Sequence, residues 1–145
     1  MATDGVQEVT QDGLLDRRVL LTQPRRGYRA GSDAILLAAA VAAQPGQTVL
    51  DVGAGVGAVS LCLARRYPDL VVRGLEIQPE LAELAAGNIS ANGLEETVHI
   101  QQGDIRCPPP EIGRTIFDHS VCTPPFYVHG NASHSPDQGK AQAHG

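Results

Sequence analysis

The sequence has few aromatic residues and no long hydrophobic run, and both absences limit what the protein can be. Aromatics make up 3% of the 145 residues and tryptophan is absent, so we expect one globular domain with an aliphatic core. The longest apolar run, from Ala34 to Ala43, is half of the roughly 20 residues that a helix needs to cross a bilayer. The amino terminus also lacks the basic-then-apolar pattern of a secretion signal. These absences predict a cytoplasmic protein that does not contact membranes.

Cysteines and histidines are also few, and their spacing indicates no covalent or metal framework. Cys62, Cys107 and Cys122 are odd in number and widely separated, which favours neither disulfides nor a zinc site. His129 and His134 lie in a polar stretch without the geometry of metal ligands. We therefore expect no bound metal.

Positive charge is scarce overall but is concentrated near the amino terminus. The net charge of −5 argues against a general nucleic-acid coat protein. Five of the eleven basic residues nevertheless fall between Arg17 and Arg29. This cluster either contacts phosphates of a substrate, with Arg25 and Arg26 as candidates, or forms an ordinary solvated arm.

Strand and helix patterns alternate along most of the chain. Short apolar stretches predict core strands at 48–52, 71–77, 98–101 and 116–122. Apolar periodicity predicts helices at 34–43, 56–66 and 79–92. A short strand is expected at 18–23, residues 1–12 are expected to be frayed, and the prolines at 108–110 allow only a minimal helix. Either Ser32 or Asp33 is expected to cap the first helix.

Alternation of this kind predicts an α/β fold, with a parallel sheet that has helices on both faces. We expect a Rossmann-like sheet with four core strands in the spatial order 3-2-1-4. Three segments follow from this reading: an arm and a helix that covers the cofactor (1–44), the cofactor-binding half (45–127), and a polar, flexible tail (128–145).

A glycine-rich loop follows the first core strand. Gly53, Gly55 and Ala58 satisfy G-x-G-x-x-[G/A], and Glu76 ends the next strand, as in a dinucleotide site whose acid binds the ribose. Asp51, at the end of the first strand, would repel a pyrophosphate but attract a ligand that carries an ammonium and a sulfonium. The loop therefore favours S-adenosylmethionine, and NAD stays open as the alternative.

A third acid, Asp104, follows the third core strand. Together with Asp51 and Glu76 it would form a polar rim at the carboxyl edge, where open α/β sheets bind their ligands. The alternative is that each acid is only a helix cap or a turn residue. Three such acids at three successive strand ends make the ligand site the better interpretation.

Several motifs together are more specific than the loop alone. They are the segment 23–37, the glycine loop, Asn88 and Asn92 late in a helix, and Pro124-Pro125-Phe126-Tyr127 after the fourth strand. In this combination the chain resembles the tRNA1(Val) adenine-N6 methyltransferases and their relatives in the methyltransferase small-domain group. The resemblance implies a class I methyltransferase fold with S-adenosylmethionine as cofactor.

The same resemblance implies a role for each cofactor-binding residue. Asp51 and the loop backbone would hold the methionine part, Glu76 the ribose hydroxyls and Asp104 the adenine ring. The segment from Gly27 to Leu37 would close over the methionine end. The implied cofactor contacts are Tyr28, Gly31, Asp51, Gly53, Gly55, Glu76 and Asp104.

The proline motif implies an amine acceptor. In the family an Asn-Pro-Pro-aromatic motif accepts both hydrogens of an adenine amine and stacks on the base, which is splayed from its stack. Here Thr123, Pro124, Pro125 and Phe126 occupy the catalytic positions, and Tyr127 is a substrate contact. The hydroxyl of a Thr accepts one hydrogen bond but lacks the carboxamide carbonyl. Loss of one such polar group typically costs on the order of 100-fold in rate.

The expected function is thus N6-methylation of an adenine in tRNA or another structured RNA. The alternatives are an impaired remnant that binds only cofactor or RNA, a glutamine N5- or small-molecule methyltransferase, and an NAD-binding module. The sequence ends where the family's next helix begins, at 135–145, so the chain resembles a truncated member. We expect its fourth strand to be an open edge through which copies self-associate.

Overall fold

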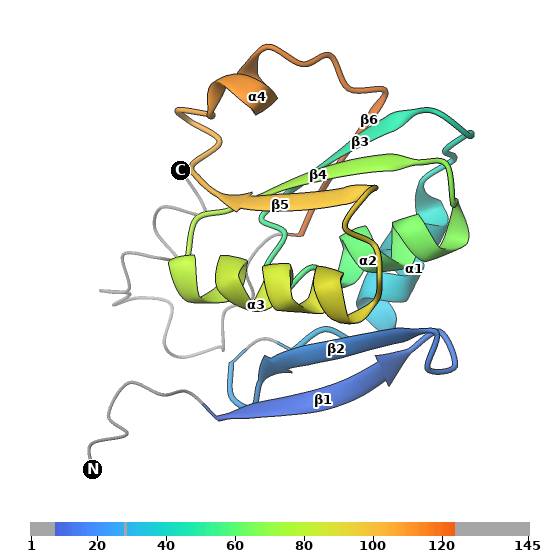
Figure 1. Ribbon diagram of the computed structural model, residues 1–145, viewed down its shortest axis with the longest axis vertical. Coiled ribbons are helices and arrows are strands. Elements are labelled where there is room, and N and C mark those ends of the chain that lie inside the picture. The colour runs from blue at the N-terminus through green and yellow to red at the C-terminus, as the bar shows by residue number, and fades with distance from the viewer. Residues whose placement is uncertain (1–7, 28, 124–145) are drawn as a thin grey trace.

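The computed structural model describes residues 8–27 and 29–123. This part of the chain forms two sheets with three helices between them, and a fourth, short helix on the outer side of the larger sheet (Figure 1). In chain order the elements are β1 (Val9–Leu14), β2 (Val19–Pro24), α1 (Ser32–Ala40), β3 (Thr48–Val52), α2 (Ala58–Arg66), β4 (Val71–Glu76), α3 (Pro79–Ala91), β5 (Val98–Gln102), α4 (Pro110–Gly113) and β6 (His119–Cys122). No helix among the described residues is long and apolar enough to cross a membrane.

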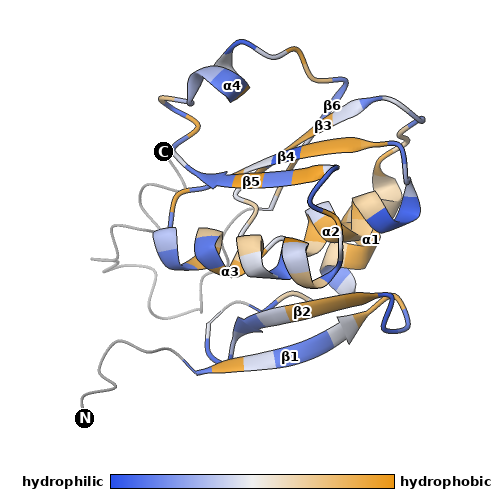
Figure 2. Ribbon diagram, in the orientation of Figure 1, coloured by the Kyte–Doolittle hydropathy of each residue, from blue (hydrophilic) through white to orange (hydrophobic). Residues whose placement is uncertain are grey.

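The four-stranded parallel sheet has the order β5-β4-β3-β6, which confirms the predicted order 3-2-1-4. Val49 pairs with Val72, and Val72 pairs with Val98, so these buried side chains share one face of the sheet. Helices α1, α2 and α3 lie on one side of the sheet and the short α4 lies on the other (Figure 1). Figure 2 shows hydrophobic residues along β4, β2 and the intervening helices, which therefore enclose the core.

Glycine and proline determine where several helices begin and end. Gly57 has φ +95°, a left-handed conformation, so α2 begins at Ala58 and not at the predicted residue 56. Pro79 opens α3, where a missing amide hydrogen costs nothing, and Gly93 with φ +67° follows its end. The expected minimal helix between β5 and β6 is α4, a single turn.

The amino-terminal strand β1 corrects, for residues 9–12, the expectation that residues 1–12 are frayed; residues 1–7 lie outside the described residues. β1 pairs antiparallel with β2 along its whole length, from Val9 opposite Pro24 to Leu14 opposite Val19. Its polar residues are satisfied by long-range contacts, because Asp12 accepts hydrogen bonds from Gln23 (2.9 Å) and from Arg29 (2.9 Å). The prediction failed because β1 is held by partners elsewhere in the chain and not by its own apolar pattern.

The start of α1 corrects a second expectation. Gly31 is the capping residue and no side chain caps the helix, whereas Ser32 is already helical. The Oδ1 atom of Asp33 instead accepts a hydrogen bond from the Gly31 amide at 2.9 Å. The helix ends at Ala40, before the predicted residue 43, and the backbone is extended at Val41. Gly31 is therefore tied to the first turn of α1.

Candidate functional site at the carboxyl edge of the sheet

The carboxyl ends of neighbouring strands bring the predicted residues to one edge. Asp51 lies near the end of β3, Glu76 ends β4 and Asp104 follows β5. The strand order places β4 between β3 and β5, and β6 with Thr123 lies on the other side of β3. The three acids and Thr123 therefore lie at the same edge of the sheet as the glycine loop.

The glycine loop has a backbone that only glycine adopts readily. Gly53, Gly55 and Gly57 have φ values of +73°, +58° and +95°. The amides of Gly53 and Ala54 both donate to the carbonyl of Leu75 at 2.9 Å, which holds the loop against the end of β4. A Cβ atom at Gly55 would meet nothing within 4 Å, so this side of the loop faces open space. The loop thus presents bare backbone to a ligand.

Asp51 is fully buried, and only one of its two carboxylate oxygens has a hydrogen bond in the described part of the chain. Its Oδ2 accepts a hydrogen bond from the Ser60 hydroxyl at 2.7 Å. Its Oδ1 is buried and has no hydrogen-bond partner among the described residues. Burial, with a smaller contribution from the charge of Glu76, raises the pKa of Asp51 from 3.8 to about 6, and the hydrogen bonds from Ser60 oppose this shift. The missing partner is a donor, and a cationic donor would restore full ionisation.

Glu76 is also buried, but both of its oxygens are occupied. Oε1 accepts a hydrogen bond from the Gly55 amide and Oε2 accepts one from the Gln78 amide, each at 2.8 Å. The first of these bonds links the end of β4 to the glycine loop. Each carboxylate oxygen keeps a free lone pair. Glu76 is therefore a fixed acceptor at the loop, able to bind hydroxyl groups.

Asp104 lies in a turn after β5 and forms an ion pair with Arg106 at 2.7 Å. The Arg106 amide donates a further hydrogen bond to Oδ1 at 2.9 Å. These hydrogen bonds, with the charge of Arg106, lower the pKa of Asp104 from its ordinary value. Asp104 stays ionised and partly exposed at the rim, on the β5 side of the loop.

The proline motif begins beside the glycine loop. The Thr123 carbonyl would lie 3.4 Å from a Cβ atom built on Gly53, so the two backbones approach closely. This contact brings the end of β6 to the same edge as the acids. Pro124, Pro125, Phe126 and Tyr127, together with Tyr28, lie outside the described residues.

The remaining predicted residues belong to the segment between β2 and α1. Gly31 precedes α1 and accommodates the local bond to Asp33. Arg25 and Arg26 are exposed, and Arg25 lies 3.6 Å from Glu8 on a mostly exposed pair of side chains. A pair of this kind contributes little to stability. Their role as substrate contacts stays a prediction.

Two polar residues at the site were not assigned a role by sequence reasoning. Ser60 lies on α2 and is the one hydrogen-bond donor to Asp51 among residues 8–27 and 29–123. Asn88 on α3 is 2% exposed and donates to the carbonyl of Val56 in the glycine loop at 2.9 Å. The spacing of Asn88 and Asn92 puts both amides on one helix face, which was the available clue.

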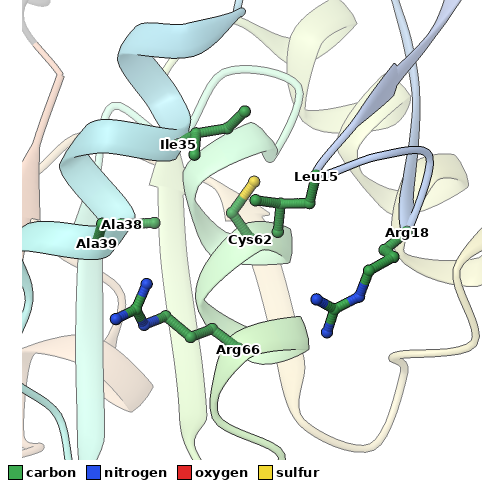
Figure 3. A pocket seen from close by; sticks show the side chains of 7 residues that line it. All are labelled: Leu15, Arg18, Ile35, Ala38, Ala39, Cys62 and Arg66. Carbon is green, nitrogen blue, oxygen red and sulfur yellow. The ribbon is translucent and has the colours of Figure 1, made fainter.

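A cavity of about 230 Å³ lies away from these residues (Figure 3). It is lined by Leu15, Arg18, Ile35, Ala38, Ala39, Cys62 and Arg66. These residues come from the β1–β2 turn, α1 and the later part of α2, and none of them is at the carboxyl edge. Within the described ranges, no three His, Cys, Asp or Glu side chains group closely enough to hold a metal ion.

The sheet order and the loop define the class of the domain, which is that of the Rossmann-like α/β folds. TYW2 from P. horikoshii, solved in complex with MeSAdo, is similar with a TM-score of 0.60 at 23% identity, over 70% of this chain and 38% of that one. YjhP from E. coli has a TM-score of 0.56 at 19% identity, over 82% and 47%. At these identities the likeness establishes the fold alone.

Within that class, residues 29–137 match the model of the methyltransferase small domain, and the chain belongs to this family. A tRNA1(Val) (adenine(37)-N6)-methyltransferase from Porphyromonas gingivalis is 35% identical over 133 residues, which are 88% of this chain and 51% of that protein. An enzyme of the same name from Yersinia enterocolitica is 31% identical, over 80% and 46%. The chain spans about half the length of the curated relatives it matches.

Proposed function

We propose that the chain binds S-adenosylmethionine at the carboxyl edge of its sheet. The observation that carries this proposal is the Oδ1 atom of Asp51, which is buried without a donor beside a loop of left-handed glycines. A buried carboxylate oxygen without a partner is costly, and a ligand ammonium would supply the missing hydrogen bond and charge. A pyrophosphate at the same place would be repelled by Asp51 and Glu76.

The other two acids fit the rest of such a ligand. Glu76 is held by two backbone amides and its free lone pairs can accept the ribose hydroxyls. Asp104 would accept a hydrogen bond from the adenine amine, in competition with Arg106. Gly53 and Gly55 would allow the ligand to approach the backbone, and Tyr28 and Gly31 would cover its methionine end.

We further propose that the full site methylates an adenine N6 in tRNA. The cofactor supplies an electrophilic methyl group on a sulfonium centre. The Thr123 hydroxyl and the Pro124 carbonyl would accept the two hydrogens of the amine, Pro125 would complete the motif, and Phe126 would stack on the flipped base. Tyr127, Arg25 and Arg26 would contact the surrounding RNA. This proposal rests on family membership and on the position of Thr123 beside Gly53.

The direct test is transfer of a radiolabelled methyl group to total tRNA. Incorporation into adenine N6 is the expected result. Protein that binds S-adenosylmethionine but labels no RNA would contradict the catalytic proposal, while cofactor binding itself would stand.

Thr123 favours a second candidate, a domain that binds cofactor or RNA without turnover. Extending the chain with the carboxyl-terminal half of a relative and introducing Thr123→Asn should then create activity. Activity in the unextended chain with Thr123 would exclude this candidate. Labelling of glutamine or of a small amine in place of RNA would support the remaining acceptor classes. Self-association through the outer edge of β6 stays a prediction, which sedimentation would test.

A further inference from the structure

The side-chain amides of Asn88 and Asn92 on α3 form hydrogen bonds with the backbone of β2, on the edge that no strand pairs with among the described residues. β1 pairs with one edge of β2, and the opposite edge faces α3. Asn92 accepts from the Leu20 amide at 2.9 Å and donates to the Leu20 carbonyl at 2.7 Å. Asn88 accepts from the Thr22 amide at 2.8 Å and donates to the Thr22 carbonyl at 2.9 Å. The two side chains thus bond alternate residues of β2, as a paired strand would.

The two amides differ in where their second N–H hydrogen goes. In Asn92 it goes to the Asn88 carbonyl, one turn earlier in the same helix, at 2.7 Å. In Asn88 it goes to the Val56 carbonyl at 2.9 Å, in the glycine loop. The side chain of Asn88 therefore joins three segments that are far apart in the chain, whereas the side chain of Asn92 joins only β2 and its own helix.

The side chain of Asn88 is buried, so the loss of one of its hydrogen bonds should be costly. Asn88 is 2% exposed, and its side-chain amide makes three hydrogen bonds to other protein groups. Removing the donor would leave the carbonyls of Thr22 and Val56 unpaired in a region with little solvent. The loop is held at its other side by Glu76, which accepts from the Gly55 amide. The conformation of residues 55 and 56 is therefore determined by one contact from β4 and one from α3.

We propose that Asn88 is a positioning residue for the cofactor site, which couples the β1–β2 hairpin to the glycine loop. The inference rests on the proposed binding of S-adenosylmethionine at that loop. A ligand that orders the loop then strengthens the bond from Asn88 to Val56 and, through the same amide, the bonds to Thr22. Coupling of this kind is reciprocal, so an ordered hairpin also favours the bound ligand.

The chain offers a matched pair of variants, Asn88→Asp and Asn92→Asp. Each replaces the donating nitrogen with an oxygen and keeps the acceptor for β2. The dissociation constant for S-adenosylmethionine, measured by titration calorimetry, should rise on the order of tenfold in Asn88→Asp, which corresponds to one lost buried hydrogen bond. In Asn92→Asp it should stay within about twofold of the unmodified protein.

A pH series separates positioning from general damage to the fold. The new carboxyl in Asn88→Asp faces two carbonyls, so its protonated form can donate one hydrogen bond again. The affinity deficit relative to the unmodified protein at the same pH should therefore shrink between pH 8 and pH 5. An equal deficit at both values, or equal deficits in the two variants, would overturn the proposal.

Hydrogen exchange of the unmodified protein provides a test that needs no variant. Saturating S-adenosylmethionine should slow exchange of the Thr22 amide at least threefold more than exchange of the Leu20 amide. Equal effects on both amides would contradict the coupling, even if Asn88→Asp failed to fold. Failure of the unmodified protein to bind S-adenosylmethionine would refute the proposed function itself, which is a different result from binding that is indifferent to Asn88.

Discussion

The ends of β3 and β4 carry two buried carboxylates that differ in how completely they are hydrogen-bonded. Glu76 at the end of β4 accepts hydrogen bonds from two backbone amides. Asp51 near the end of β3 has one hydroxyl donor, and its Oδ1 has no partner among the described residues. Burial raises the pKa of Asp51 to about 6. Glu76 is therefore fully hydrogen-bonded within the protein, whereas Asp51 can gain a hydrogen-bond donor from a ligand.

The buried carboxylate of Asp51 lowers the stability of the free protein, although it can favour ligand binding. Between pH 3.8 and about 6 the folded protein binds more protons at Asp51 than the unfolded chain does. The free energy of unfolding therefore falls as the pH rises through this window, and the stabilisation present below it is lost above it. A polar group that destabilises the free protein but satisfies a ligand is typical of a binding site.

The largest effect is expected for Asp51→Asn. Loss of the charge should weaken S-adenosylmethionine binding on the order of 100-fold, because a charged hydrogen bond is removed. The free energy of unfolding at pH 7 should rise by about 1–3 kcal/mol, since the buried charge is gone. Calorimetric titration and urea unfolding measure the two quantities. Weaker binding together with lower stability would show that Asp51 has only a structural role.

Glu76→Gln should weaken cofactor binding and lower the stability of the protein. The new NH₂ group must face one of the two backbone amides that now donate to Glu76, so two hydrogen-bond donors would oppose each other. We expect about tenfold weaker cofactor binding and a loss of about 1–2 kcal/mol in stability, because a buried hydrogen bond is broken. The same two assays apply. If Glu76→Gln were as stable as the unmodified protein, the hydrogen bonds of Glu76 would not stabilise the fold, and the proposed difference from Asp51 would be wrong.

The affinity for S-adenosylmethionine should depend on pH through Asp51. Only the ionised carboxylate pairs with an ammonium, and with a pKa of about 6 roughly a tenth of Asp51 is ionised at pH 5. The dissociation constant should therefore fall by about tenfold from pH 5 to pH 7 and then level off. Asp51→Asn should bind weakly and equally at all three of pH 5, 6 and 7. A pH-dependent Asp51→Asn would assign the titration to another group.

The smallest effect is expected for Ser60→Ala. The Ser60 hydroxyl donates to Asp51 and lowers its pKa, so its removal should move the midpoint of the affinity profile to higher pH. Affinity at pH 8 should change only slightly, because Asp51 is ionised there in both proteins. The pH series above measures the shift. A midpoint that moves to lower pH would contradict the described hydrogen bond.

The parallel sheet and the positions of the acids were predictable because their determinants are local. Strand, glycine loop and helix follow one another between Thr48 and Arg66, and Glu76 and Asp104 each end or follow a strand. The hairpin partner β1 was missed because its polar residues are satisfied by Gln23 and Arg29. The bond from Asn88 to Thr22 spans 66 positions, so no local pattern encodes it.

The proposal that Asp51 binds the cation of the cofactor can be tested by titration calorimetry at pH 6 with S-adenosylmethionine and with NADH, in two buffers of different ionisation enthalpy. S-adenosylmethionine should bind with release of protons, because the ligand cation lowers the pKa of Asp51, and NADH should not bind. Binding of NADH without binding of S-adenosylmethionine would refute the proposal.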